Sequence, residues 1–565
     1  VQFVVTAAQE FSAGGAVKIR AREVDPCGTF LGDTYTLSDS SGSTNEYYPV
    51  AIARTGKPDV GVAWQDGRNS TDFNIWMGHV GLKPNLPLEP PRDVRAVAGG
   101  YVLAHSGEMV FSWTLTSIPG RPGTGHLPFG LTITHRARNV ETAGDLGYGW
   151  RHNYEEWLDN ISGGKLTFHR GNGRDDVFTL NGSTYEPQAG IYETITYDAG
   201  TDTYTCSSRY GITKKFQLRN GVYRLVEIKF RKSTLTITYT SGGDIDYITD
   251  SRGKVIDFAT NGSGRITSFT DFASRAWVLG YTSDELITVR TPTTTEFPSG
   301  CTTTFAYTSG GAHAWMNHRL DTVTDAKSQV YLDVSLKGDK VSSLRRGDSG
   351  DDYVLTYGRC KTTEVDPDGD TQTLDFSSTD QTITKIEVFT RGLRSGEPSS
   401  YVSTFTHNAQ TELTEVILPR GNKVKRTFDH TNSNFKAKGN LLEARIDSHV
   451  SGEADIVESY TYETVNQQVR TKTDADSNAW NWRYDTDEPT DGDQNDDGVT
   501  TQDAGALVRF TAPAVTSGQP STQNIIYKFL NNSNGQRTRV THSGGREDAY
   551  NYFSSGNSQD WLQTM

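Results

Sequence analysis

Short alternations of apolar and polar residues fill most of the chain, and turn residues interrupt them at close intervals. The segments 235–239 and 353–357 are examples, and each leads to a turn that contains Asp and Gly, at 250–253 and 366–369. Alternation with a period of two, bounded by such turns, predicts antiparallel β-hairpins. The sequence therefore predicts an all-β fold built as an array of β-hairpins.

The same unit recurs as a strand, a turn with Asp and Gly or Asn, and a second strand with an aromatic residue. Phe258 stands eight positions after Asp250, and Leu374, which precedes Phe376, stands eight positions after Asp366. The turn needs Gly or Asn for a positive φ. The large side chain packs one hairpin against the next, because a lone hairpin buries too little surface. Degenerate repeats of this kind indicate an array rather than a single closed core.

Changes in residue composition and in the hydrophobic pattern along the chain predict four parts. Residues 1–82 form a small β module, and residues 83–93 form a linker with four prolines, which keep it extended and without ladder hydrogen bonds. Residues 94–190 form a second small β domain, and residues 191–565 form the hairpin array. The expected architecture is thus small β domains followed by a long β-array.

Charge and composition narrow the classes of function. The 565 residues include 55 Lys and Arg against 69 Asp and Glu, a net charge of −14, which disfavours nucleic-acid partners. Hydrophobic residues at 34% and aromatic residues at 10% argue against wholesale disorder. No apolar run approaches the length of a transmembrane helix. Because residues 1–5 show no initiating Met or basic leader, we expect a section of a longer polypeptide.

Four cysteines stand far apart in the sequence, at Cys27, Cys206, Cys301 and Cys360. They form no CxxC pair, which argues against a zinc cluster. One or two disulfides and separate buried thiols both remain open, and spacing alone selects no pairing.

An acidic loop within 491–503 is the best candidate for a bound ion. Its candidate ligands are Asp491, Asp493, Asn495, Asp497, Val499 through its carbonyl, and Asp503. Oxygen ligands at alternate positions with Gly498 at the sixth place match the needs of a calcium loop. The run resembles dockerin and EF-hand loops, but Ala504 stands at position 12 and the last acid is one residue early. The loop predicts a structural Ca²⁺ site; the alternative is a solvated acidic loop.

Motifs for catalysis are missing from the sequence. We find no HExxH, no Gly-x-Ser-x-Gly elbow, no Walker loop and no Rossmann glycine pattern. Acid pairs such as Glu155 and Glu156 occur, but the carboxylates of a glycosidase come from distant positions that one sequence cannot pair. We therefore expect no catalytic residues and no enzyme activity, with a glycan-cleaving site as the alternative.

The strongest local motif lies in 144–154. Its core reads Leu-Gly-x-Gly-Trp-x-His-Asn-Tyr, and Gly147 and Gly149 predict a tight turn that inserts Trp150 beneath the first strands. We interpret His152 and Asn153 as polar groups of this turn rather than as catalytic residues.

The hairpin units over roughly 190–565 and the motif at 144–154 together resemble the RHS/YD-repeat family. The motif is similar to the domain that precedes the repeats in bacterial members, although His135-Arg136 departs from the usual residues. The resemblance implies a long β-sheet that spirals into a hollow shell, as in polymorphic toxins, insecticidal toxin complexes and teneurins. Residues 1–82 resemble a blade of bacterial surface β-propellers, through Pro-Val-Ala at 49–51 and the stretch 60–76 with Val-Ala-Trp-Gln-Asp-Gly-Arg and Ile-Trp, and no second complete blade follows.

These observations predict a non-enzymatic bacterial scaffold that is secreted or displayed at the cell surface, as part of a larger RHS-repeat protein. Its expected partners are other segments of a longer polypeptide, copies of itself, or glycans. One alternative is a toxin-delivery shell whose effector lies beyond Met565, although no Asp-Pro-x-Gly cleavage segment stands near that end. Another is a carbohydrate-binding or polysaccharide-degrading surface protein.

Overall fold

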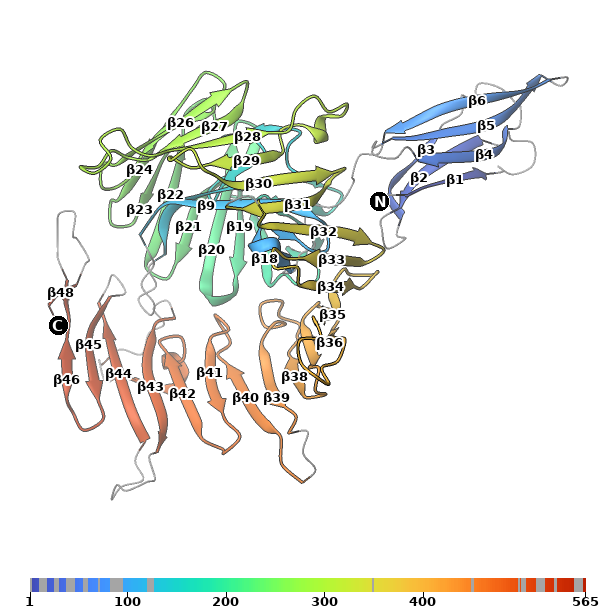
Figure 1. Ribbon diagram of the computed structural model, residues 1–565. Helices are drawn as coiled ribbons and strands as arrows, with labels where there is room; N and C mark the ends of the chain where they lie inside the picture. Colours follow the sequence, from blue (N-terminus) through green and yellow to red (C-terminus); the bar gives the residue numbers. More distant parts are fainter. Residues whose placement is uncertain are drawn as a thin grey trace. The chain divides into compact units, whose positions relative to one another are not determined.

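The computed structural model describes residues 95–118, 127–347, 350–448, 452–495, 498, 505–514, 524–532 and 536–552, and elsewhere only the backbone of strands β1 to β6 and β48. Nearly every regular element is a β-strand (Figure 1). The helical elements of the described residues are short: η1 (Ala98–Gly100), η2 (Arg209–Gly211), η3 (Ala314–Met316) and α1 (Glu488–Asp491). The all-β prediction is confirmed. The predicted linker, 83–93, lies outside the described residues.

The N-terminal strands form two antiparallel three-stranded sheets, β1-β2-β3 and β4-β5-β6. Their bounds are β1 (Phe3–Gln9), β2 (Lys18–Val24), β3 (Phe30–Thr36), β4 (Glu46–Ala53), β5 (Asp59–Asn69) and β6 (Asp72–Gly81). The β5–β6 hairpin covers the stretch that resembles a propeller blade. The propeller interpretation itself stays a prediction.

A five-stranded sheet of order β13-β10-β9-β8-β7 follows, with a small pair β11-β12 beside it in the chain. The strands are β7 (Ala96–Val97), β8 (Val102–Leu103), β9 (Glu108–Ile118), β10 (Phe129–Arg136), β11 (Ala143–Gly144), β12 (Gly147–Tyr148) and β13 (Trp150–His152). Gly147 and Gly149 have φ of 87° and 76°, and Trp150 is almost completely buried. The predicted tight turn at this motif is thus confirmed.

The dominant element among the described residues is one 33-stranded sheet in which β14 to β46 follow in sequence order. The first strands are β14 (Trp157–Ser162), β15 (Lys165–His169), β16 (Asp175–Asn181), β17 (Thr184–Pro187), β18 (Glu193–Asp198), β19 (Thr203–Ser208), β20 (Ile212–Arg219), β21 (Val222–Phe230), β22 (Ser233–Tyr239), β23 (Ile245–Asp250), β24 (Val255–Thr260), β25 (Ile266–Thr270), β26 (Ala276–Thr282), β27 (Glu285–Arg290), β28 (Thr302–Tyr307), β29 (Leu320–Thr324) and β30 (Val330–Lys337).

The sheet continues with β31 (Lys340–Arg346), β32 (Asp352–Gly358), β33 (Lys361–Val365), β34 (Thr371–Phe376), β35 (Ile383–Phe389), β36 (Ser400–His407), β37 (Leu413–Ile417), β38 (Lys423–Phe428), β39 (Leu441–Ile446), β40 (Ile456–Tyr462), β41 (Val469–Thr473), β42 (Ala479–Tyr484), β43 (Leu507–Ala514), β44 (Asn524–Asn531), β45 (Arg537–His542) and β46 (Glu547–Ala549). A last pair joins β47 (Asn551–Tyr552) and β48 (Leu562–Thr564).

The beginning of this sheet closes on itself. Strand β14 pairs with its neighbour β15 and also with β21, where Trp157 faces Arg224 and Leu158 faces Tyr223. The strands from β14 to β21 therefore form a closed ring of eight. An eight-strand ring leaves an interior that side chains can fill.

The chain divides into two compact units. The first comprises Val1–Phe111, His135–Ala143 and Thr303–Val402, and the second comprises Ser112–Thr134, Gly144–Thr302 and Ser403–Met565. The eight-strand ring and the Trp150 motif belong to the second unit.

In the first unit, the start of the described chain is fixed to strands far along the sequence. The Ala98 N–H donates to Glu364 at 2.9 Å, and the Thr362 hydroxyl donates to the Ala104 carbonyl at 2.6 Å. Arg136 forms a buried bidentate pair with Glu108 at 2.9 and 2.5 Å. Burial raises the pKa of Glu108, but the charge and hydrogen bonds of Arg136 outweigh burial and lower it.

Many hairpin turns share one hydrogen-bonded design. An Asp or Asn side chain opens the turn and accepts the backbone N–H groups two and four residues later, as Asp250 does from Arg252 and Lys254 at 2.9 and 2.8 Å. The same pair of bonds occurs at Asn261, Asp271, Asp325, Asn408 and Asp474. This local bonding explains why turn aspartates and asparagines recur in the sequence.

Tyrosine hydroxyls tie neighbouring strands together. A tyrosine near the end of one strand donates to a carbonyl of a preceding strand at 2.8–2.9 Å. The pairs are Tyr239 to Leu225, Tyr281 to Ile266, Tyr357 to Val341, Tyr462 to Leu441, Tyr484 to Val469 and Tyr552 to Arg537. A register shift directly precedes each tyrosine except Tyr357. The tie and the bulge together form a repeating structural unit of the array.

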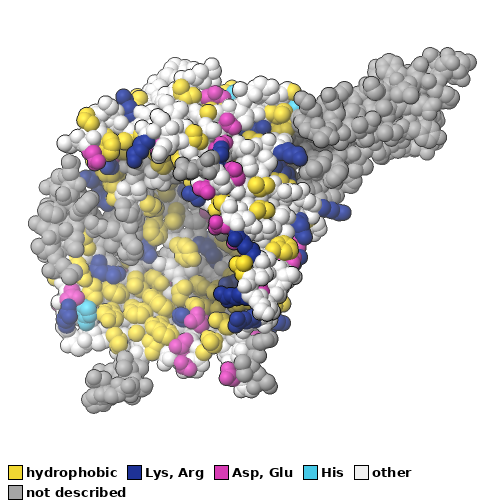
Figure 2. Space-filling view, viewed as in Figure 1, with side chains coloured by type: hydrophobic (Ala, Val, Ile, Leu, Met, Phe, Trp, Pro, Cys, Tyr) yellow, Lys and Arg dark blue, Asp and Glu magenta, His cyan; other side chains and the backbone are white. Residues whose placement is uncertain are grey.

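The C-terminal strands keep one partly exposed apolar face. Phe405, Val416, Val424, Ile446 and Ile456 lie directly opposite one another across successive strands. Figure 2 shows hydrophobic side chains gathered in the lower part of the view, where Figure 1 places β38 to β44. An apolar sheet face of this kind is typical of a surface that contacts another polypeptide.

Two further observations bear on the sequence-based expectations. Of the cysteines within the described residues, Cys206 and Cys301 are free thiols and Cys360 is disulfide-bonded. Cys27 lies outside the described residues. Among the residues that the structure describes, no helix combines the length and apolar character required to cross a membrane.

Candidate functional site

The predicted calcium loop lies partly outside the described residues. Asp497, Val499 and Asp503 are among the residues whose structure is not described. Asp493 accepts the N–H groups of Asn495 and Gly498 at 3.2 and 2.8 Å. These two hydrogen bonds are what the structure describes of the loop beyond Asp493, and the calcium site stays a prediction.

Two predicted calcium ligands, Asp491 and Asn495, contact other groups of the protein. Asp491, in α1, forms ion pairs with Arg470 and, at 3.5 Å, with Arg483. Asn495 is buried and donates its amide N–H to the Phe529 carbonyl at 3.0 Å. The structure thus gives Asp491 cationic partners that the sequence did not indicate.

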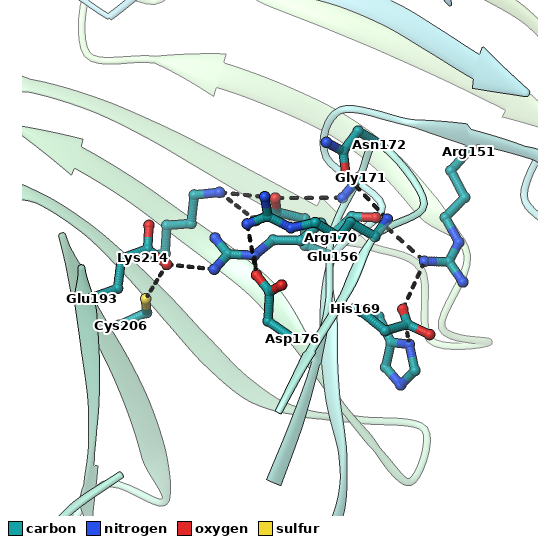
Figure 3. Close-up of polar contacts among 12 residues, drawn as sticks. Arg151, Glu156, His169, Arg170, Gly171, Asn172, Asp176, Glu193, Cys206 and Lys214 are labelled. Atoms are coloured by element: carbon teal, nitrogen blue, oxygen red, sulfur yellow. Dashed lines mark hydrogen bonds and ion pairs between the residues drawn. The ribbon is translucent and has the colours of Figure 1, made fainter. Parts of the chain in front are cut away.

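The interior of the eight-strand ring holds a network of charged side chains (Figure 3). Arg170 reaches Asp176 at 2.7 Å and Glu193 at 2.5 Å. Arg174 adds a second cation to Asp176 at 2.8 Å. Lys214 binds both carboxylate oxygens of Glu156, at 2.8 and 2.6 Å.

Strand register explains how these residues meet. In the ladder, Asp176 lies opposite Phe168, and Lys214 lies opposite Cys206, so their side chains share the inner face of the ring. The Arg170 guanidinium lies over the Phe168 ring at 3.9 Å, which adds a cation–π contact. Three cationic side chains therefore contact three carboxylates on the inner face of the ring, next to the Phe168 side chain.

The charges of this network stabilise one another. Burial lowers the pKa of Arg170, but Glu193 and Asp176 outweigh burial and raise it. Burial also raises the pKa of Glu193, but the charge and hydrogen bond of Arg170, together with the charges of Lys214 and Arg174, outweigh burial and lower it. Both groups therefore stay ionised near neutral pH. An interior pair of this kind is destabilising to break but is weak evidence for function.

The thiol of Cys206 lies at the edge of the network, 3.6 Å from Glu193. Burial raises its pKa well above the ordinary value, and the nearby Glu193 carboxylate raises it further. Because the thiolate is the reactive form of cysteine, this side chain is an inert core group.

A second buried cluster joins Asp145, His152 and Glu155, all from the motif at 144–154 and the residue after it. Within the described part of the chain, it is the one group of metal-capable side chains whose donor atoms lie within 4.8 Å of one another. His152 Nε2 lies 3.4 Å from an Asp145 oxygen, and the Asp145 N–H donates to Glu155 Oε1 at 3.2 Å. Glu155 Oε2 is buried without a hydrogen-bond partner.

The hydrogen bonds of His152 decide between a metal and a proton at this cluster. The Tyr154 N–H donates to Nδ1 at 3.3 Å, so the ring proton stands on Nε2, which faces Asp145. A metal-bound histidine normally donates a hydrogen bond from its other ring nitrogen. Here that nitrogen faces a donor, so the geometry favours proton sharing over metal binding.

The electrostatics of the two acids in this cluster differ. Burial raises the pKa of Asp145, but the contact with His152 and the charges of Arg224 and Arg265 together outweigh burial and lower it. Burial and the Asp145 charge raise the pKa of Glu155 to about 7. The cluster therefore contains one ionised acid and one acid that titrates near neutrality.

Open hollows occur in each compact unit. One of about 790 Å³ in the first unit is lined by Tyr353, Phe389, Leu393 and Arg394 among others. One of about 400 Å³ in the second unit lies over β20 to β22, beside Lys215 and others. Neither hollow is lined by residues of the two charged clusters.

Sequence reasoning missed both clusters. It treated Glu155 and Glu156 as one acid pair, but the structure sends Glu155 toward Asp145 and Glu156 toward Lys214. Both acids lie in the turn between β13 and β14, where the Glu155 N–H donates to the His152 carbonyl and the Glu156 N–H donates to the Tyr154 carbonyl. Strand alternation does not apply in such a turn, so the sequence offered no signal for separating the two acids.

Comparisons with known proteins found one family model and several solved structures. The family described as "Domain of unknown function (DUF6531)" matches residues 99–178, which include the Trp150 motif and the first strands of the ring. No curated protein matches the chain.

Similar solved structures have low sequence identity. The TcdB2-TccC3 crystal structure is 11% identical with a TM-score of 0.39, and the match covers 99% of this chain and 36% of that chain. A TcdB2-TccC3-Cdc42 structure is 12% identical with a TM-score of 0.33, covering 98% and 24%. The Photorhabdus luminescens Tc holotoxin pore is 11% identical with a TM-score of 0.30, covering 99% and 27%. This chain thus spans between about a quarter and a third of those chains.

Proposed function

We propose that this chain is a structural β-scaffold of the RHS/YD-repeat class, a section of a larger bacterial protein that works without catalytic chemistry. The observation that carries the proposal is the 33-stranded sheet in sequence order, closed at its start by the β14–β21 pairing. In such an array each strand is held mainly by its neighbours, so strength grows with every added hairpin.

The scaffold acts by resisting unfolding and proteolysis. Backbone ladders supply most of the hydrogen bonds, the turn aspartates fix the hairpin ends, and the tyrosine ties add bonds between strands. A β-sheet that resists unfolding and proteolysis fits the extracellular or cell-surface location inferred from the sequence, and that location remains a prediction.

The apolar face of the C-terminal strands supports the proposed partners. Ile446 and Ile456 are about half exposed, at 47% and 55%, and lie opposite each other in the ladder. Burying apolar area of this kind stabilises association. Other segments of a longer polypeptide, or copies of this chain, would supply that cover.

The test is an electron-microscopy image of the native particle combined with limited proteolysis. We expect a β-rich particle that resists protease while exposed loops are nicked. Turnover of a polysaccharide by the purified protein, lost on a single carboxylate substitution, would contradict the proposal and favour the glycan-cleaving alternative.

We further propose that the acidic loop at 491–503 holds a structural Ca²⁺. Bringing several carboxylates into one turn is unfavourable without a cation. We expect calcium to raise the Tm of the purified protein and excess chelator to lower it, with Asp493→Asn abolishing the response. An unchanged Tm after chelation would remove the calcium proposal and leave the scaffold proposal intact.

A further inference from the structure

Residues 144–155 form a segment that is fixed against hairpins further along the same unit. The Ile266 N–H donates to the Asp145 carbonyl at 2.9 Å, and the Tyr148 N–H donates to the Asp284 carbonyl at 3.2 Å. Arg265 donates to the Gly144 carbonyl at 2.7 Å. A handful of hydrogen bonds to β25 and the β26–β27 turn thus holds the segment in place.

The Glu155 carboxyl lies against Gly144 and Asp145, the residues of the segment whose carbonyls accept the hydrogen bonds from Arg265 and Ile266. Its Oε1 accepts the Asp145 N–H, and a Cβ at Gly144 would collide with that oxygen. Its Oε2 is buried and makes no hydrogen bond. One oxygen of the carboxyl therefore has a single backbone donor and the other has none, which is too little to compensate a full negative charge in a buried place.

The charged neighbours favour an ionised Asp145 more than an ionised Glu155. The groups that act on the cluster are Asp145 and His152 from the segment, Arg151 from β13, Arg224 from β21, Tyr239 from β22, Arg265 from the turn just before β25 and Asp284 from the β26–β27 turn. Arg224 and Arg265 act on Asp145, while Arg265 also pairs with Asp284 at 3.2 Å. Of the arginines, Arg151 acts on Glu155.

We propose that the protonation state of Glu155 controls how firmly the 144–155 segment is held against β25 to β27. As a neutral acid, Glu155 fits between Gly144 and Asp145. As an anion, it places a second negative charge beside Asp145 in a buried space, and the segment opens more often. This device is independent of the scaffold proposal, because it concerns one local contact.

The sign of the effect follows from the two states of Glu155. In the open segment the carboxyl has an ordinary pKa near 4.5, and in the closed segment burial and Asp145 raise the pKa to about 7. The closed state therefore binds the proton more tightly, and its advantage is complete below pH 4.5 and lost as the pH rises to about 7.

The test is hydrogen exchange of the full chain, followed by mass spectrometry of peptides that cover 144–155. After correction for intrinsic exchange rates, we expect protection of these amides to fall at least about tenfold between pH 5.5 and pH 8, because each pKa unit is a factor of ten. In Glu155→Gln, which stays neutral, we expect protection that does not change with pH.

Two more variants sharpen the test. Glu296→Gln changes an exposed glutamate and should keep the wild-type pH dependence. Asp145→Asn removes the neighbouring charge and should make the loss of protection level off at a lower pH. A wild-type segment with pH-independent protection overturns the proposal, and so does a pH dependence that persists in Glu155→Gln. Protection that responds to zinc or chelator in the wild type, and not in Glu155→Gln, overturns it in favour of a metal.

Discussion

Two clusters of buried charged side chains in the second unit compensate the charge of their carboxylates in different ways. Inside the eight-strand ring, Arg170, Arg174 and Lys214 meet three carboxylates at hydrogen-bond distance. In the 144–155 segment, Glu155 shares a buried space with Asp145 and has an oxygen without a donor. One cluster balances its charges by ion pairs, and the other balances them by holding a proton.

The difference shows how one fold can contain both a rigid and an adjustable charged site. A matched network stays ionised over the whole neutral range, so its contribution to stability is constant there. An acid with a raised pKa exchanges its proton near neutrality, so its contribution changes with pH. The predictions below separate these two behaviours, from the largest expected effect to the smallest.

Breaking the matched network gives the largest effect. Arg170→Met leaves Asp176, which is completely buried, and Glu193 without their shared cation. Removing one partner of a buried pair costs about 3–5 kcal/mol. We expect the free energy of unfolding, measured by chemical denaturation at pH 7, to fall by this amount.

The matched control is Arg546→Met, which removes an arginine that pairs with Asp548 at 2.9 Å but is 75% exposed. Exposed pairs contribute little, so we expect a much smaller change. Equal effects of the two substitutions would mean that the ring interior is hydrated and that the network is not buried in solution.

The second largest effect comes from Glu155, and we expect it in the pH dependence of the free energy of unfolding of the wild-type protein. The raised pKa of Glu155 contributes about 3 kcal/mol below pH 4.5, and this contribution is lost as the pH rises to about 7. Glu108 and Glu193 have lowered pKa values, so their contribution is present above about pH 4.5 and is lost as the pH falls. Denaturation from pH 3 to 8 should therefore show maximal stability in mildly acid solution.

Glu155→Gln is the internal check on that profile. We expect the variant to lose the decline between pH 4.5 and 7 while it keeps the acid-side loss from Glu108 and Glu193. A decline that persists unchanged in the variant would assign it to other groups, and the contrast between the two clusters would disappear.

The smallest expected loss of stability comes from removing a buried hydrogen bond between uncharged groups. Tyr484→Phe removes the tie to the Val469 carbonyl at 2.9 Å without changing any charge. We expect a loss of about 1 kcal/mol that does not vary between pH 4.5 and 8. Tyr401→Phe, at a 43% exposed ring, serves as the control, and a loss as large as that of Tyr484→Phe would argue against the ties as stabilising contacts.

The fold could be predicted from the sequence because its signals are local. Alternation, turn residues such as Asp250 and the glycines before Trp150 act over a few residues, and the structure uses each of them as expected. The order of the strands also follows the chain, so no distant pairing had to be guessed over most of the sheet.

The charged clusters could not be predicted because they depend on which face of a strand turns inward. Asp176 and Lys214 stand among polar neighbours in the sequence and look like solvent-facing positions. Only the closure of β14 on β21 makes their side an interior. Likewise, Arg470 and Arg483 beside Asp491 come from strands whose placement the acidic loop does not encode.

Closure of the ring also makes the first edge of the sheet different from its last edge. Strand β14 uses the outer hydrogen-bonding edge at Trp157 and Leu158 to meet β21, so those residues offer no template there for a strand from a neighbouring molecule. Pairing of a strand from another molecule is thereby disfavoured at this part of the β14 edge, so the first strand of the sheet has a built-in protection against edge-to-edge association.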